Sequence, residues 1–168
     1  TSYTIPQIGK FNSVTYLVLL EDNSIADYKE KLVNSLLLQM KYKKNYIISK
    51  DIILYNQYDS AKNDFIKYLK EFTDIMYPKW KNNLENIEKF YKSYQKSINN
   101  EIEDAKSNQH YPQDLYNKEQ DKAFYGIINE LKKLEDDSKK NTFKKIRELE
   151  KVGTDARFTA SVMSIIVL

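Results

Sequence analysis

Apolar residues recur along the middle of this chain at alternating spacings of four and three, and this pattern limits the fold more than any other feature. The first half of the pattern consists of Leu54, Tyr58, Ala61, Phe65, Tyr68, Phe72 and Ile75. The second half consists of Trp80, Leu84, Ile87, Tyr91, Tyr94, Ile98 and Ile102. Residues with this spacing form one stripe along an α-helix. The sequence therefore predicts long helices that pack along partner helices, in a predominantly all-α fold.

Pro78 separates the two halves of this pattern. Proline lacks a backbone N–H and disfavours helical angles in the residue before it. Because the apolar spacing resumes almost at once and turn residues are scarce, we expect one continuous or kinked helix over residues 49–107. The alternative is a reversal of the chain at Pro78, which turns the same segments into a compact four-helix bundle.

Two further helices are predicted on either side of this region. One begins after Ser24, a suitable N-cap, and its apolar face contains Ile25, Tyr28, Leu32, Leu36 and Met40. The other extends from about residue 113 to Val152, before Gly153, which is a natural helix stop. Its apolar seam contains Ala123, Ile127, Leu131, Leu134, Ile146 and Leu149. The predicted fold is an elongated three- or four-helix antiparallel bundle or coiled coil.

The two ends of the chain differ from this helical middle. Residues 13–20 (SVTYLVLL) and 161–168 (SVMSIIVL) are uncharged and rich in β-branched side chains. Such runs are typical of strands, and we expect short β-like segments that pair with each other, with another subunit or with lipid. We predict a single domain with an extended segment over 1–23, a helical bundle over 24–152 and an apolar segment over 153–168.

These terminal segments are the predicted contact surfaces, because an uncovered strand without charges promotes aggregation. The candidate interaction residues near the N-terminal end are Val14, Tyr16, Leu17, Val18 and Leu19. Those near the C-terminal end are Phe158, Val162, Met163, Ile165, Ile166, Val167 and Leu168.

A basic stripe on the last predicted helix is a candidate anion-binding site. It consists of Lys140, Lys144, Arg147 and Lys151, which we place roughly opposite Phe143 and Ile146 on the helix. Such a stripe can hold the phosphates of nucleic acid or of anionic lipid. The solvated face of a lysine-rich helix has the same pattern, and nearby Glu148 and Glu150 weaken the positive field.

Composition argues against several kinds of site. The chain has no cysteine, and its one histidine, His110, lies in a loop sequence without a nucleophile or a second metal ligand nearby. The acidic clusters NNEIEDAK and LEDDSKK are expected to be solvated faces. Glu-x-x-His, glycine-rich phosphate loops and nucleophile elbows are missing from the sequence. We therefore expect no enzyme activity, metal, cofactor or small-molecule substrate.

The charge balance gives little support to a nucleic-acid partner. The chain has 27 basic and 24 acidic residues, a net charge of +3. Base-specific reading of DNA usually relies on arginine, and only Arg147 and Arg157 are present.

Together these features predict a non-enzymatic helical assembly or interaction protein, a structural or surface component of a microbe or virus. Its expected partner is a second copy or another protein. Two alternatives remain open: a membrane-active helical protein of the pore-forming-toxin type, and a coat protein that packages nucleic acid without sequence specificity. No run approaches the ~20 apolar residues that a helix needs to span a membrane, and a lipid surface is one of the partners left open.

We favour a secreted, surface or virion location over a cytoplasmic one. The first residues, TSYTIPQIGK, have neither a basic segment nor a long apolar segment. We therefore expect no secretory signal peptide within this sequence, although one could have preceded it.

Overall fold

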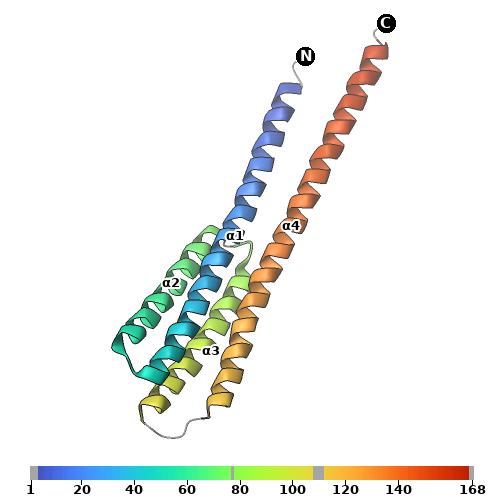
Figure 1. Cartoon of the computed structure of the whole chain (residues 1–168). Coiled ribbons are helices and arrows are strands. Elements are labelled where there is room, and N and C mark those ends of the chain that lie inside the picture. Colours follow the sequence, from blue (N-terminus) through green and yellow to red (C-terminus); the bar gives the residue numbers. More distant parts are fainter. Residues whose placement is uncertain (1–3, 77, 108–111, 167–168) are drawn as a thin grey trace. The chain divides into compact units, whose positions relative to one another are not determined.

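The computed structural model describes the backbone over residues 4–76, 78–107 and 112–166, and the side chains over 20–76, 78–107, 112–148 and 151. The described residues form four helices: α1 (Thr4–Ser49), α2 (Ile52–Met76), α3 (Lys81–Lys106) and α4 (Gln113–Ile166) (Figure 1). They include no strand, and the prediction of an all-α bundle is confirmed.

The chain divides into two compact units. The bundle unit is Ile25–Leu134, and the helix-pair unit combines Thr1–Ser24 with Glu135–Leu168.

Within the bundle unit, the chain reverses direction between α2 and α3. The Phe65 and Tyr91 rings stack with 3.9 Å between their centroids, and the Tyr58 hydroxyl donates a hydrogen bond to Gln95 at 2.8 Å. These pairs follow opposite orders along the two helices, so α2 and α3 are antiparallel (Figure 1). The expected continuous helix over residues 49–107 was wrong, because Pro78 begins a short turn that ends at α3.

The return of α4 alongside α3 completes a four-helix bundle. Ser97 of α3 donates a hydrogen bond to Glu119 of α4 at 2.9 Å, and Asn83 donates one to Glu130 at 3.0 Å. The order of these pairs shows that α3 and α4 are also antiparallel. The bundle unit therefore has the up-down-up-down topology in which short connections join neighbouring helices.

The connection between α1 and α2 consists of Lys50 and Asp51. Lys50 has a φ of 57°, in the left-handed region, and its ammonium group donates a hydrogen bond to the Ala105 carbonyl at 2.6 Å. The Asp51 carboxylate accepts a hydrogen bond from the Ile53 N–H at 2.8 Å. The N-cap of α2 is therefore Asp51.

The apolar stripes predicted from the sequence form the core of the bundle unit. Every residue of the second half of the pattern, from Trp80 to Ile102, is buried. In α2 the buried residues are Tyr58, Ala61, Phe65, Leu69, Phe72 and Met76. Tyr68 is only half-buried and Ile75 is exposed. The stripe drifts along α2 because a straight helix has about 3.6 residues per turn rather than 3.5.

The strands predicted at the two ends of the chain are helical instead. Residues 13–20 lie within α1, and residues 161–166 lie within α4, which continues through Gly153. Short β-branched runs are ambiguous between strand and helix. Here each run continues an existing helix without a turn, and each added residue gains a backbone hydrogen bond. The predicted helix boundaries at Ser24 and Gly153 were wrong for the same reason.

The helix-pair unit contains the first part of α1 and the last part of α4, which run in opposite directions (Figure 1). The carboxylate of Asp22 joins them, because it accepts hydrogen bonds from the hydroxyls of Ser138 and Thr142. The bond from Thr142 measures 2.8 Å. Ser138 and Thr142 are one turn apart on α4, so a single carboxylate on α1 contacts two successive turns of its neighbour.

Candidate interaction surfaces

A ring of hydrogen-bonded polar side chains crosses the core of the bundle unit. The Lys43 ammonium on α1 lies 2.7 Å from the Glu101 carboxylate on α3 and donates a second hydrogen bond to Gln120 on α4 at 2.9 Å. Gln120 closes the ring by donating to Glu101 at 2.8 Å. The side chains of Lys43 and Glu101 are only 8% and 2% exposed. Because a buried charge is costly without its partner, the ring links α1, α3 and α4 in one register.

A second polar layer lies one turn earlier on α1, at Gln39. Its carboxamide oxygen accepts hydrogen bonds from Gln95 at 2.6 Å and from Tyr91 at 3.3 Å. Its amide nitrogen donates to the Ala61 carbonyl at 3.3 Å. Gln39 therefore connects α1 with α2 through its amide nitrogen and with α3 through its amide oxygen.

Tyr94 differs from these hydrogen-bonded residues, although it is buried in the same core. Its side chain is fully buried, and its hydroxyl has no hydrogen-bond partner among the described residues. Burial raises the pKa of Tyr94 far above its ordinary value of 10.0, as it does for Tyr58 and Tyr91. These phenols therefore stay protonated at neutral pH.

The polar contacts in the interior of the bundle unit link its helices to one another. Among the described residues, no three His, Cys, Asp or Glu side chains lie where they could share a metal ion. His110 lies outside the described residues.

Sequence reasoning missed the buried ring. The expectation of a solvated acidic cluster was wrong for Glu101, which is buried. The signal was present in the spacing, since Gln39 and Lys43 continue the apolar stripe of Leu32 and Leu36 at intervals of three and four. A polar residue on an apolar stripe is a candidate for a buried, hydrogen-bonded position.

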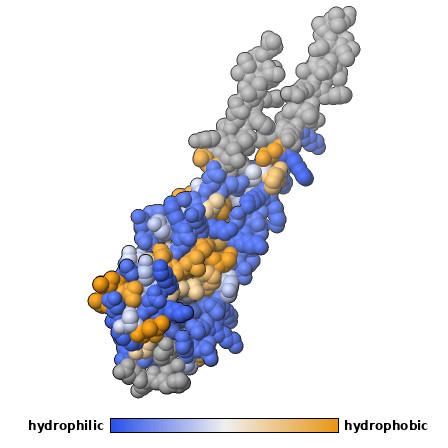
Figure 2. Space-filling model, viewed as in Figure 1, coloured by the Kyte–Doolittle hydropathy of each residue, from blue (hydrophilic) through white to orange (hydrophobic). Residues whose placement is uncertain are grey.

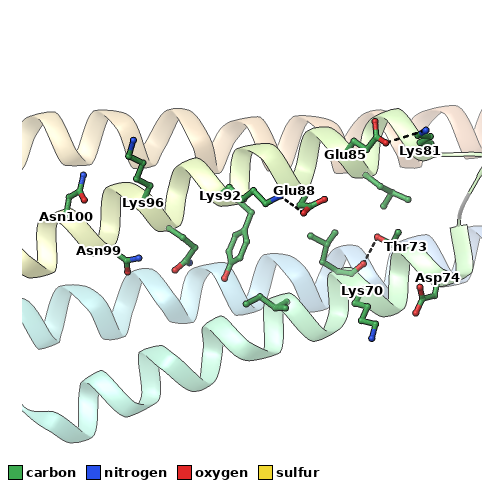
Figure 3. A pocket seen from close by; sticks show the side chains of 15 residues that line it. Lys70, Thr73, Asp74, Lys81, Glu85, Glu88, Lys92, Lys96, Asn99 and Asn100 are labelled. Atoms are coloured by element: carbon green, nitrogen blue, oxygen red, sulfur yellow. Dashed lines mark hydrogen bonds and ion pairs between the residues drawn. The ribbon is translucent and has the colours of Figure 1, made fainter.

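A groove of ≈ 870 Å³ lies on the surface of the bundle unit between α2 and α3 (Figure 3). Its lining includes the nearly buried Leu69, Leu84 and Tyr91. Charged side chains form its rim, among them Glu88 and Lys92, which point toward each other and pair at 2.7 Å. The face in Figure 2 is mainly hydrophilic, with scattered hydrophobic patches. Because its rim charges are partly neutralised by each other, the groove favours no single class of ligand.

The predicted basic stripe of α4 forms a surface hollow of ≈ 600 Å³ in the helix-pair unit. The hollow is lined by Lys140, Phe143, Lys144, Arg147, Glu148 and Lys151. Phe143 is 66% exposed and lies on the same side as the cations, so its expected place opposite them was wrong. At about 100° per residue, position 143 is only about 40° around the helix from position 147. The structure thus adds an exposed aromatic ring to the predicted stripe.

The predicted interaction residues at the chain ends belong to the helix-pair unit. Val14, Tyr16, Leu17, Val18 and Leu19 lie in α1, and Phe158, Val162, Met163, Ile165 and Ile166 lie in α4. The structure describes their backbone but not their side chains, and Val167 and Leu168 lie outside the described residues.

Within the described ranges, no helix is long and apolar enough to cross a membrane. In comparisons with known proteins, no family model, no curated protein and no solved structure matches this chain.

Proposed function

We propose that this chain is a non-enzymatic helical assembly protein, and that its helix-pair unit packs against the same unit of a second copy. One observation carries the proposal. Two uncharged stretches, residues 11–20 and 158–166, lie at opposite ends of the sequence yet belong to helices of the same unit. Among its described residues that unit consists of one segment of α1 and one segment of α4.

Two helical segments cannot cover such stretches by themselves. A helix packed against one neighbour buries a single stripe of side chains. Tyr16 to Leu20 are five consecutive apolar residues in α1, which is more than one full turn at about 3.6 residues per turn. A run longer than one full turn is wider than the single stripe that one neighbouring helix covers, so a third and a fourth helix are needed to remove it from water.

A second copy supplies those helices. Two helix pairs related by a two-fold axis form an intermolecular four-helix bundle, with the same residues buried in both chains. Asp22 supports this arrangement because it joins α1 to α4 through Ser138 and Thr142, so each pair is organised before the copies meet. The bundle unit has its own buried core, which lies apart from the uncharged stretches in the sequence.

The test is the mass of the protein in solution, measured by light scattering after size-exclusion chromatography. The wild type is expected at twice the chain mass of 20.0 kDa. The double substitution Leu17→Asp with Val162→Asp places charges in both stretches and is expected to give the monomer mass. Circular dichroism should show that most of the helix content remains, because the bundle unit is untouched.

A matched control is Ile53→Asp with Ile75→Asp, which adds the same charge to exposed positions on α2, 62% and 54% exposed. Its mass should equal that of the wild type. A monomeric wild type, or a dimeric Leu17→Asp/Val162→Asp variant, would overturn the proposal.

A further inference from the structure

We propose that the hollow around Phe143 on α4 docks on the surface of an anionic lipid bilayer. The residues of this surface differ from those of the stretches proposed to join two copies. Its lining combines four basic side chains, one acidic side chain and one exposed aromatic ring. The inference rests on that combination.

The exposed ring is the first argument. Phe143 is 66% exposed, although a phenyl ring is among the more favourable groups to remove from water. Its described neighbours in the hollow include the basic side chains of Lys140, Lys144 and Arg147. A ring surrounded by cations suits the interface of a bilayer, where the ring enters the acyl boundary and the cations remain at the phosphates.

The availability of the cations is the second argument. The Lys140 ammonium lies 3.5 Å from the Asp137 carboxylate, and the Lys144 ammonium lies 4.0 Å from the Glu148 carboxylate. The lysine side chains are 78% and 76% exposed. Ion pairs this exposed contribute little in water, so lipid phosphates can displace the carboxylates at small cost.

The single aromatic residue favours lipid over nucleic acid. Proteins that bind single strands stack successive bases on several aromatic side chains along a basic groove. Among the described residues that line this hollow, Phe143 is the one aromatic residue, so these residues offer a strand a single stacking platform. A bilayer needs no repeated stacking platform, because its headgroups present phosphates in every direction across the surface.

Vesicle co-sedimentation of the full chain tests the inference. The wild type is expected to bind vesicles of phosphatidylcholine with phosphatidylserine, and not vesicles of phosphatidylcholine alone. Binding should weaken as salt is raised, because screening shortens the reach of the cations. The variant Lys144→Gln/Arg147→Gln should bind about 25-fold more weakly, since each basic residue near an anionic surface contributes about fivefold.

The control variant is Lys92→Gln/Lys96→Gln on α3, which removes the same charge from exposed positions in the bundle unit. It should bind the mixed vesicles as tightly as the wild type. A third variant, Phe143→Trp, places a fluorophore at the centre of the hollow. Its emission should shift to shorter wavelength when mixed vesicles are added, because the ring leaves water.

Three results would overturn the inference: equal binding to both kinds of vesicle, equal losses in the two double variants, or no shift in Phe143→Trp emission. Binding to a single-stranded oligonucleotide that depends on Lys144 and Arg147, without vesicle binding, would assign the hollow to nucleic acid instead. The mass by light scattering should be unchanged in Lys144→Gln/Arg147→Gln. Loss of lipid binding and loss of assembly are therefore distinguishable.

Discussion

Lys43 and Glu101 form an ion pair at 2.7 Å inside the bundle unit, and both side chains are more than nine-tenths buried. Gln120 hydrogen-bonds to both partners and completes the ring. A buried pair of this kind contributes little net stability compared with apolar residues of similar size, yet either partner alone is strongly destabilising. The three side chains of the ring therefore depend on one another, and the loss of one is expected to destabilise the bundle unit more than the loss of all three.

Lys43→Met is expected to lower the free energy of unfolding by about 3–5 kcal/mol, because it leaves the Glu101 carboxylate buried without its cation. The triple variant Lys43→Met/Glu101→Leu/Gln120→Leu should recover most of that loss, since no polar group remains unpaired. Urea denaturation followed by circular dichroism measures both. A triple variant less stable than Lys43→Met would contradict this account of the ring.

Tyr94→Phe is expected to stabilise the protein by about 1 kcal/mol, because it removes a buried hydroxyl that lacks a hydrogen-bond partner. The matched control is Tyr58→Phe, whose hydroxyl donates to Gln95 at 2.8 Å. That substitution should destabilise by about 1–3 kcal/mol, since the Gln95 oxygen loses a donor. The two midpoints in urea should move in opposite directions. Equal destabilisation by both substitutions would show that the Tyr94 hydroxyl has a partner in solution.

Alkaline pH should destabilise the bundle unit through its buried phenols. Burial raises the pKa of Tyr58, Tyr91 and Tyr94 well above the ordinary 10.0. Above pH 10 the unfolded chain releases these protons while the folded chain keeps them, so unfolding becomes more favourable as pH rises. Their contribution is complete below pH 10 and is lost as pH rises toward the folded values.

Urea midpoints between pH 9 and 11 measure this effect. The wild type should lose stability more steeply than the triple variant Tyr58→Phe/Tyr91→Phe/Tyr94→Phe, which retains the chain's other ionisable groups. Identical slopes for the two proteins would show that these phenols do not control the alkaline transition.

Gly126 of α4 allows a close approach of α3, because a Cβ atom at this position would lie 2.6 Å from the Phe90 ring. Gly126→Ala is therefore expected to destabilise by about 1–2 kcal/mol through overpacking, despite the higher helix propensity of alanine. In a Phe90→Ala background the ring is gone, and the same substitution should stabilise by about 1 kcal/mol. A double-mutant cycle in urea tests this change of sign, and additive effects would contradict it.

The helical class and most of the core could be predicted from apolar spacing alone. In α3 the predicted stripe from Trp80 to Ile102 is buried throughout. In α2 the stripe was displaced, since Leu69 and Met76 are buried while Ile75 is exposed. A repeat of 3.5 residues and a helix of about 3.6 diverge by about 20° per heptad, and a fixed spacing rule does not follow that drift.

The course of the chain at Pro78 and at both termini could not be predicted in the same way. A short turn needs only a few residues of ordinary composition, so Pro78 was the main feature of the sequence that indicated the chain reversal. At the ends, β-branched side chains suggested strands, but α1 and α4 extend through residues 13–20 and 161–166. The backbone hydrogen bonds gained by extending an existing helix outweighed the preference of the β-branched residues for a strand.

The candidate surfaces were predictable in part. Lys140, Lys144, Arg147 and Lys151 share one hollow, as their spacing indicated. The sequence analysis placed Phe143 opposite these cations, although a turn of about 100° per residue brings it to their side of the helix. Apolar spacing marks where side chains are buried, whereas a polar residue on the stripe, such as Lys43, is recognised only when its partners on other helices are known.

The most direct test of assembly through the helix-pair unit is site-directed crosslinking, since the chain has no cysteine of its own. The single variants Leu17→Cys and Val162→Cys place a thiol in each uncharged stretch, and Lys92→Cys places one on the exposed face of the bundle unit. With a short bis-maleimide, the account predicts a covalent dimer of twice 20.0 kDa for the first two variants and a monomer for Lys92→Cys. Crosslinking of Lys92→Cys alone, or equal crosslinking of all three variants, would contradict it.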